Sequence, residues 1–119
     1  MLKFEDLEAW KEARRLVRSV YHVTKDKELS GDFRLCSQIQ AAAVSIMSNI
    51  AEGFERRGKA EKMQFYSIAR ASCGELRSQL YVIEDVFPRF ESKTVKLRED
   101  SVIVGKLISG LISSTSRRP

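Results

Sequence analysis

Residues 38–57, QIQAAAVSIMSNIAEGFERR, constrain the fold of this chain more than any other stretch. Apolar side chains recur here every three or four residues, which places them along one face of a helix. Other small or apolar side chains extend this character to a second face, so the helix should be buried on more than one side. The stretch is too short and too often interrupted by polar residues to span a bilayer. The first face is Ile39, Ala42, Ile46, Ile50 and Gly53, and the second is Ala43, Met47 and Ala51.

This two-sided character predicts that the helix packs inside its own bundle and also against another copy of the chain. Asn49 is expected to be a buried polar group that fixes register or oligomeric state, as core asparagines do in coiled coils. Gly53 is expected to permit the close approach of a neighbouring helix. The residues expected at the contact between copies are Ala43, Met47, Asn49 and Ala51.

Helical spacing of apolar residues recurs along most of the chain. The two prolines, Pro88 and Pro119, lie at an expected helix end and at the last position, so the long helices are uninterrupted. The segment 102–104 could also form a strand, but the three preceding helices offer no sheet for it to join. The pattern therefore predicts one all-α domain, an antiparallel up-down-up-down four-helix bundle over residues 1–119. Its expected helices cover residues 4–25, 33–57, 60–86 and 92–113.

Cap and turn chemistry predicts how these helices begin and end. Asp6 is expected to be the N-cap of the first helix. The polar composition of residues 25–32 indicates a loop. Gly58 is expected to end the second helix, and the tail over residues 114–119 is expected to be disordered.

The charge balance favours an anionic partner. The net charge is +5 and the pI is near 9.4, which points to nucleic acid before a membrane surface. Cys36 and Cys73 lack the CxxC spacing of a metal or redox site, so we expect buried free thiols in a reducing compartment. The amphipathic, acid-containing start of the chain resembles no signal or transit peptide, and we expect a cytoplasmic protein.

Two clusters of basic residues are the candidate nucleic-acid-binding groups. Basic clusters hold backbone phosphates with little sequence preference, and a symmetric assembly would repeat each cluster. The alternative is a pair of solvated faces whose charge is balanced by nearby Glu8, Glu12, Glu55 and Glu61, and the sequence leaves both interpretations open. The clusters are Lys11, Arg14, Arg15 and Arg18 in the first helix, and Arg56, Arg57, Lys59 and Lys62 around the turn between the second and third helices.

Catalytic chemistry finds little support in the sequence. Glu52 and Glu75 could face each other across two helices, but a di-iron bundle needs Glu-x-x-His spacing, and the single histidine, His22, lies in no such motif. The serines have no His/Asp partners, and no glycine-rich phosphate loop is present. We therefore expect that the protein is not an enzyme and that it binds no cofactor and no metal. Trp10 is expected to anchor the core or an interface rather than to stack on bases.

An ordered set of motifs over residues 4–83 resembles the 23S rRNA intervening-sequence protein family. Those motifs are Phe4-x-x-Leu7-x-x-Trp10-x-x-Ala13, Val20-Tyr21, Leu35-x-x-Gln38, the run Ala42-Ala43-Val44-Ser45-Ile46, the run Ser48-Asn49-Ile50-Ala51-Glu52-Gly53, and Ile68-Ala69-Arg70 with Glu75-Leu76. Met47 stands where the family usually has proline, so no kink is expected there. Gln40 and Ala41 stand where arginine is common, which removes two basic groups from that face.

The resemblance implies a homopentameric barrel of four-helix bundles with no known catalytic activity. The family also resembles the accessory variability determinants of diversity-generating retroelements, which bind a reverse transcriptase and its RNA. With the basic clusters, this leads us to expect a non-enzymatic, oligomeric adaptor that binds RNA or DNA, with a reverse transcriptase or another protein as a further partner. The alternative is a protein–protein scaffold whose basicity is incidental.

Overall fold

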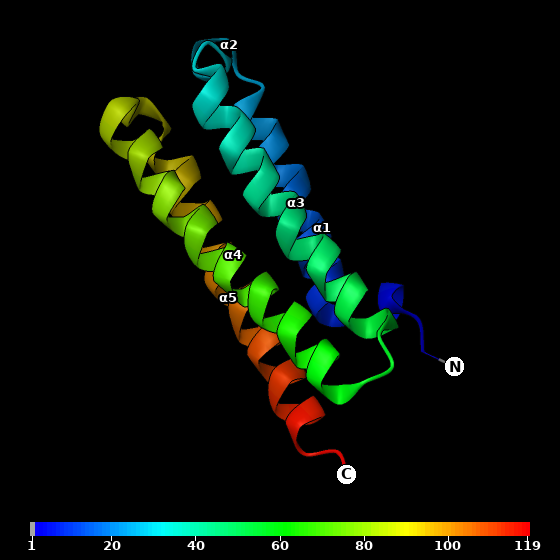
Figure 1. The fold of residues 1–119 in the computed structure, drawn as a ribbon. Helices are drawn as coiled ribbons and strands as arrows, with labels where there is room; N and C mark the ends of the chain where they lie inside the picture. Colours follow the sequence, from blue (N-terminus) through cyan, green and yellow to red (C-terminus); the bar gives the residue numbers. More distant parts are fainter. Residues whose placement is uncertain (1) are drawn as a thin grey trace.

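A computed structural model describes residues 2–119 and shows a bundle of four long helices (Figure 1). The all-α prediction is confirmed, and the long helices make antiparallel contacts. Three short elements lie between or before them. The elements in order are η1 (Phe4–Asp6), α1 (Glu8–Thr24), α2 (Lys27–Ser30), α3 (Phe33–Glu55), α4 (Lys59–Val86), η2 (Pro88–Phe90) and α5 (Glu91–Ser116).

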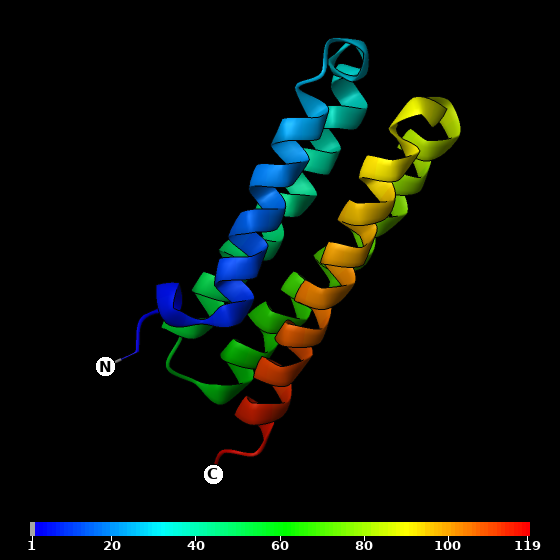
Figure 2. The same ribbon diagram turned by 180° about the vertical axis from the view of Figure 1, so that it is seen from behind.

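The bundle is elongated, with principal extents of 50 × 20 × 17 Å. Helices α1 and α3 form one hairpin and α4 and α5 form another, as the two opposite views show (Figures 1 and 2). The α2 and η2 elements lie at one end of the bundle. The α3–α4 turn and both chain ends lie at the other end.

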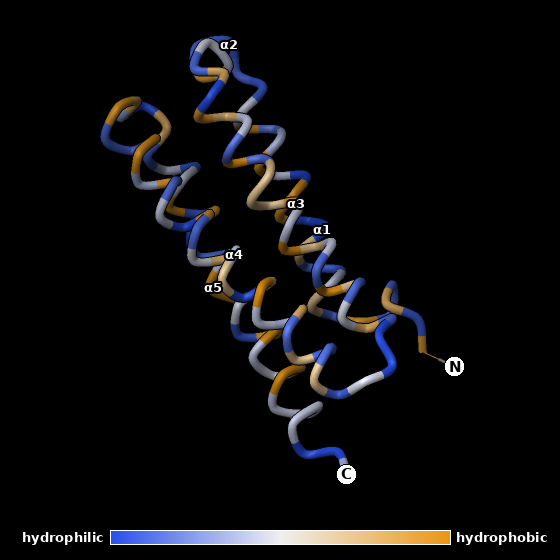
Figure 3. The backbone as a smooth tube through the Cα atoms, viewed as in Figure 1, coloured by the Kyte–Doolittle hydropathy of each residue, from blue (hydrophilic) through white to orange (hydrophobic). Residues whose placement is uncertain are grey.

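The core lies between the two hairpins and follows the apolar stripes of all four helices. Apolar residues recur at regular intervals along each helix (Figure 3). Burying such stripes, rather than helix propensity, supplies most of the stability of helices in a bundle. The fully buried apolar residues include Val20 in α1, Ile39, Ile46 and Ile50 in α3, Leu76, Leu80 and Ile83 in α4, and Ile108 in α5.

Several element boundaries differ from the sequence-based prediction. Asp6 is not the N-cap of α1: it lies in η1, where its carboxylate accepts a hydrogen bond from the backbone N–H of Lys3 at 2.9 Å. Leu7 occupies the N-cap position and offers no side-chain cap. The expected loop over residues 25–32 contains α2, because the carboxylate of Asp26 caps it by accepting from the N–H of Glu28 at 2.9 Å.

The C-terminal helix is longer than predicted. Helix α5 continues through the expected tail as far as Ser116, and Thr115 is only 4% exposed. The Nζ atom of Lys59 also donates to the backbone carbonyl of Arg118 at 2.7 Å, which ties the chain end to the start of α4. The burial of Thr115 and the contact of Arg118 keep part of the tail ordered, although its composition alone suggested disorder.

The two hairpins are joined at the α2 end by one arginine. The guanidinium of Arg89 in η2 donates to Asp26 from Nη2 at 2.9 Å and to Glu28 from Nε at 2.5 Å. Both carboxylates belong to the α1–α3 connection, whereas Arg89 belongs to the α4–α5 connection. The contacts therefore bridge the two hairpins at this end of the bundle.

Candidate nucleic-acid interface

The outward face of α1 brings together all four basic residues predicted for the first helix. Buried residues at positions 9, 13, 16 and 20 face the core, so side chains three and four positions apart on the other side face outward. There they surround a hollow of about 420 Å³. The residues that line it are Glu5, Trp10, Lys11, Arg14, Arg15 and Arg18.

The four cations of this α1 basic face differ in what they contact. Lys11 lies 3.7 Å from the carboxylate of Glu8, and Arg15 pairs with Glu12. Within residues 2–119, neither Arg14 nor Arg18 forms an ion pair. Exposed ion pairs contribute little and exchange readily, so the paired cations remain able to contact an anion. Arg14 and Arg18 need break no ion pair to do so.

Trp10 forms part of this hollow as well as packing on the bundle. Its ring meets that of Phe4 edge-on, with centroids 5.1 Å apart. The guanidinium carbon of Arg14 lies 5.7 Å from the Trp10 ring centroid, within the range of a cation–π contact. Trp10 therefore packs on the bundle, as the sequence suggested, and its ring also borders the basic hollow.

The second predicted cluster, at the α3–α4 turn, is partly committed to the fold. Arg56 contacts Glu52 at 3.1 Å and Glu61 at 3.9 Å. The Nζ atom of Lys62 donates to the carbonyl of Phe54 at 2.7 Å, which satisfies an acceptor at the C-terminal end of α3. Burial, with Arg118 as a second cause, lowers the pKa of the Lys62 ammonium. Arg56 thus pairs with Glu61, one of the balancing acids expected from the sequence, whereas the backbone partner of Lys62 was not expected.

The remaining cations at this end of the bundle form an end cluster of Arg57, Lys59, Arg117 and Arg118. All four are exposed. The arginines at 117 and 118 were missed because the tail was expected to be disordered. The consecutive arginines were the available signal, but only the packing of α5 against α4 brings Arg118 beside Lys59.

The residues expected at a contact between copies are separated by the structure. Ala43 is fully buried in its own bundle, so it cannot touch another copy, and that assignment is corrected. Its neighbour Ala42 is buried too, because helix α3 contacts α1 on one side and α4 on the other. Met47, Asn49 and Ala51 are half-buried.

Asn49 takes part in a polar cluster at the α3–α4 seam. Its Nδ2 atom donates to the Oγ of Ser45 at 3.0 Å and to the Ser45 carbonyl at 2.8 Å. The Oγ of Ser45 in turn lies 3.0 Å from the Oγ of Ser72 in α4. The contacts of Asn49 stay within α3, and only the contact between Ser45 and Ser72 joins α3 to α4.

The residues weighed for catalysis do not converge. Glu52 and Glu75 are both exposed, and Glu52 pairs with Arg56. Among residues 2–119, no three His, Cys, Asp or Glu side chains lie close enough to hold a metal ion. Cys36 and Cys73 are buried free thiols.

Comparison with known proteins gives one match. The model of a family described as 23S rRNA-intervening sequence protein matches residues 5–110, which include all of α1, α3 and α4. A search of curated proteins finds no relative that matches the chain. None of the helices formed by residues 2–119 has an apolar run long enough to cross a bilayer.

Proposed function

Because the chain belongs to the 23S rRNA-intervening sequence protein family, we propose that it is a nucleic-acid-binding adaptor with no catalytic activity of its own. In this proposal the α1 basic face holds backbone phosphates of RNA or DNA. The observation that supports it is the gathering of four cations and one tryptophan around a single hollow. The free thiols of Cys36 and Cys73 are consistent with a reducing, cytoplasmic location.

Phosphate binding explains the composition of this face better than recognition of bases. Arginine and lysine side chains on an exposed helix contact phosphate oxygens, which carry no sequence information. Each neutralised phosphate releases condensed counterions, with a slope of about −0.9 in log K against log salt for duplex DNA. Four such contacts would give a slope of about −3 to −4 for one chain.

The proposed adaptor is a homo-oligomer, and the family resemblance suggests a pentamer. The outward side of α3 supports an assembly, because Ala41, Val44 and Ser48 face away from the core and no charged residue lies between Arg34 and Glu52. An uncharged side of small residues allows two backbones to approach closely. Each added copy would repeat the α1 basic face and increase the affinity for a long polyanion.

Light scattering tests the assembly. We expect a mass several times that of one chain, and we expect Val44→Glu to lower it. Val102→Glu is the matched control, since both valines are 38% exposed and lie on different helices. A wild-type protein that stays monomeric at every concentration, or one whose mass is unaffected by Val44→Glu, would contradict this arrangement.

Mobility-shift titrations across a range of salt concentrations test nucleic-acid binding. Arg14→Glu combined with Arg18→Glu should abolish most binding to duplex RNA and duplex DNA. The control is Arg70→Glu with Arg77→Glu, which changes the net charge equally on the exposed side of α4. Arg57→Glu with Lys59→Glu should show how much the end cluster adds. Binding that is absent at low salt, or equal losses in the α1 and control variants, would exclude the α1 basic face as the interface.

A protein–protein scaffold is the alternative function. Three exposed apolar residues on α4 favour it, namely Ile68, Val82 and Val86, whose exposed fractions are 41%, 44% and 59%. The resemblance suggests a reverse transcriptase as the protein partner. Recovery of a stoichiometric protein partner free of nucleic acid, together with no binding in the salt titration, would favour this function over the adaptor.

A further inference from the structure

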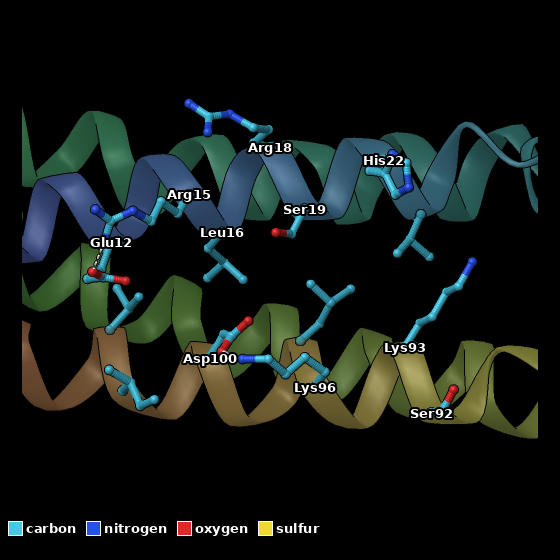
Figure 4. A pocket seen from close by; sticks show the side chains of 14 residues that line it. Glu12, Arg15, Leu16, Arg18, Ser19, His22, Ser92, Lys93, Lys96 and Asp100 are labelled. Atoms are coloured by element: carbon cyan, nitrogen blue, oxygen red, sulfur yellow. Dashed lines mark hydrogen bonds and ion pairs between the residues drawn. The ribbon is translucent and has the colours of Figure 1, made fainter.

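A groove of about 740 Å³ runs between α1 and α5, and it borders the α1 basic face, with which it shares Arg15 and Arg18 (Figure 4). It lies where the two hairpins meet, and it is bounded by one helix from each. Serines stand on both walls, Ser19 on α1 and Ser92 on α5. Because these side chains are short, they leave the space between the helices unfilled.

The floor of the groove is apolar. It consists of Leu16 and Val23 from α1 and of Leu97 and Val104 from α5, and most of the lining surface is apolar. Ile103 adds a large side chain that is 51% exposed on the groove wall. An apolar floor between two parallel walls suits the apolar stripe of a third helix.

The charges on the rim are distributed unevenly along its length. At one end, Glu12 pairs with Arg15, and Lys96 pairs with Asp100 at 2.7 Å, so the cations are balanced. At the end nearer α2, the rim carries Arg18, His22 and Lys93. Among the described residues, neither Arg18 nor Lys93 forms an ion pair. Lys93 extends across the groove toward α1, whereas the guanidinium of Arg18 points away from the groove, over the outer side of α1 (Figure 4).

We propose that this groove binds an amphipathic α-helix of a partner protein, with its apolar stripe on the floor and its acidic residues at the end where Lys93 lies. The α1 wall from Glu12 to Val23 extends for about 16 Å at 1.5 Å per residue, so about three turns of helix fit. Charge complementarity selects an acidic partner and also its orientation.

Nucleic acid fits this groove less well than an acidic helix does. A phosphate backbone gains nothing from Leu16, Leu97 or Val104, and burying phosphates against them would cost desolvation. The hollow of the α1 basic face has a different lining, because four of its six lining residues are cations. The two surfaces therefore suit two kinds of partner, and the groove proposal does not depend on nucleic-acid binding.

A selection from a phage-displayed library tests the proposal while the natural partner is still unidentified. The library holds random peptides of about 12 residues, the length that matches the groove, flanked by helix-capping residues. We expect enrichment of sequences with apolar residues three and four apart and with clustered Asp or Glu. The highest-affinity peptide is then synthesised with a fluorophore, and its affinity for purified full-length variants is measured by anisotropy.

Three variants locate the binding. Lys93→Glu should weaken binding by about tenfold or more, because it places a negative charge on the protein where the acidic end of the bound helix lies. Lys106→Glu is the control, since this exposed lysine lies on α5 outside the groove. Ser19→Phe should abolish binding by filling the groove, provided that its circular dichroism and melting match those of the wild type. If Ser19→Phe is misfolded, Lys93→Glu alone decides.

The outcomes are distinct. Enrichment of acidic amphipathic peptides that lose affinity in Lys93→Glu and keep it in Lys106→Glu supports the proposal. Enrichment without an excess of acidic residues, no enrichment, or equal affinity for Lys93→Glu and the wild type overturns it. Because the titration with RNA and DNA uses other variants, failure of the nucleic-acid proposal would not be mistaken for failure of this one.

Discussion

Tyr66 packs directly against Gly53: a β-carbon on Gly53 would lie 2.7 Å from Cε1 of the tyrosine ring. The same β-carbon would lie 3.2 Å from the Cβ of Phe65. The expectation that Gly53 permits close approach of a helix is therefore confirmed, and that helix is α4. Tyr66 is 2% exposed, and burial raises the pKa of its hydroxyl.

Replacing this glycine should destabilise the bundle. Gly53→Ala must displace a buried ring, and overpacking of this kind costs about 1–3 kcal/mol. Gly110→Ala is the control, because nothing lies within 4 Å of a β-carbon there and alanine favours the helix by up to about 1 kcal/mol. Urea denaturation measures both free energies of unfolding. Equal midpoints for Gly53→Ala and the wild type would show that the two helices are less closely packed.

The hydrogen bond between Ser45 and Ser72 should contribute measurably to stability. Ser72→Ala removes a group that is 8% exposed and leaves the Ser45 hydroxyl with one fewer partner, at a cost of about 1 kcal/mol. Ser67→Ala on the exposed side of α4 is the control. In a double-mutant cycle, Ser45→Ala and Ser72→Ala should cost less together than the sum of the two. Strict additivity would argue that the hydroxyls do not interact.

Glu84 should make stability depend on pH in the acidic range. Arg98 donates to its carboxylate at 2.8 Å, and this hydrogen bond, helped by one from Thr94, holds the pKa of Glu84 below its usual value. A carboxyl with a lowered pKa in the folded state stabilises the protein above its unfolded-state pKa. That contribution is lost as the pH falls through the folded-state pKa.

Glu84→Gln should therefore reduce the free energy of unfolding at neutral pH and make its decline toward acidic pH shallower. Glu75→Gln provides the control, since Glu75 is exposed and makes no side-chain hydrogen bond or ion pair within residues 2–119. Urea denaturation at several pH values between about 7 and 3 gives both curves. If Glu84→Gln keeps the wild-type dependence on pH, the Arg98 contact contributes no proton linkage.

Both thiols should be unreactive in the folded protein. Burial raises the pKa of the Cys73 thiol to about 11 and also raises the pKa of Cys36. The thiolate is the reactive form, so Ellman's reagent at mildly alkaline pH should modify neither cysteine until the bundle unfolds. Modification should then follow the unfolding rate as urea is added. Rapid stoichiometric labelling in buffer alone would contradict this burial.

Lys62 should matter for stability and not for nucleic-acid affinity. Lys62→Met removes the ammonium that contacts the carbonyl of Phe54, and contacts with a helix C-terminus contribute about 0.3–1 kcal/mol. Lys106→Met, which removes an exposed lysine, is the control for stability. Mobility shifts of the same variants should be nearly equal. A large loss of binding in Lys62→Met alone would return this residue to the interface.

The sequence determined the helices more securely than their ends. Apolar residues that recur every three or four positions indicate a helix whatever that helix packs against, so all four long helices were predictable. The packed end of α5 depends on contacts with a distant segment, such as the hydrogen bond from Lys59 to the carbonyl of Arg118. No local pattern encodes such contacts.

The candidate site was predictable to the extent that it lies on one helix. Lys11, Arg14 and Arg18 share a face of α1 whatever that helix packs against. Ala43 was wrongly assigned to a contact between copies. The spacing of apolar residues shows that two sides of α3 are apolar, but it does not show which helices cover each side. In the structure α1 and α4 cover α3, so its core extends over Ala43 and a more polar, uncharged side remains outside.

The contacts of Arg89 have a consequence for how the halves of the chain meet. They join residues that are 61 and 63 positions apart in sequence, whereas each hairpin forms from neighbouring segments. A molecule with both hairpins formed but still separate would have full helical content and would lack these contacts. A probe placed beside Arg89 would therefore report the docking of the two hairpins. Circular dichroism would not detect this step, because the helical content stays the same.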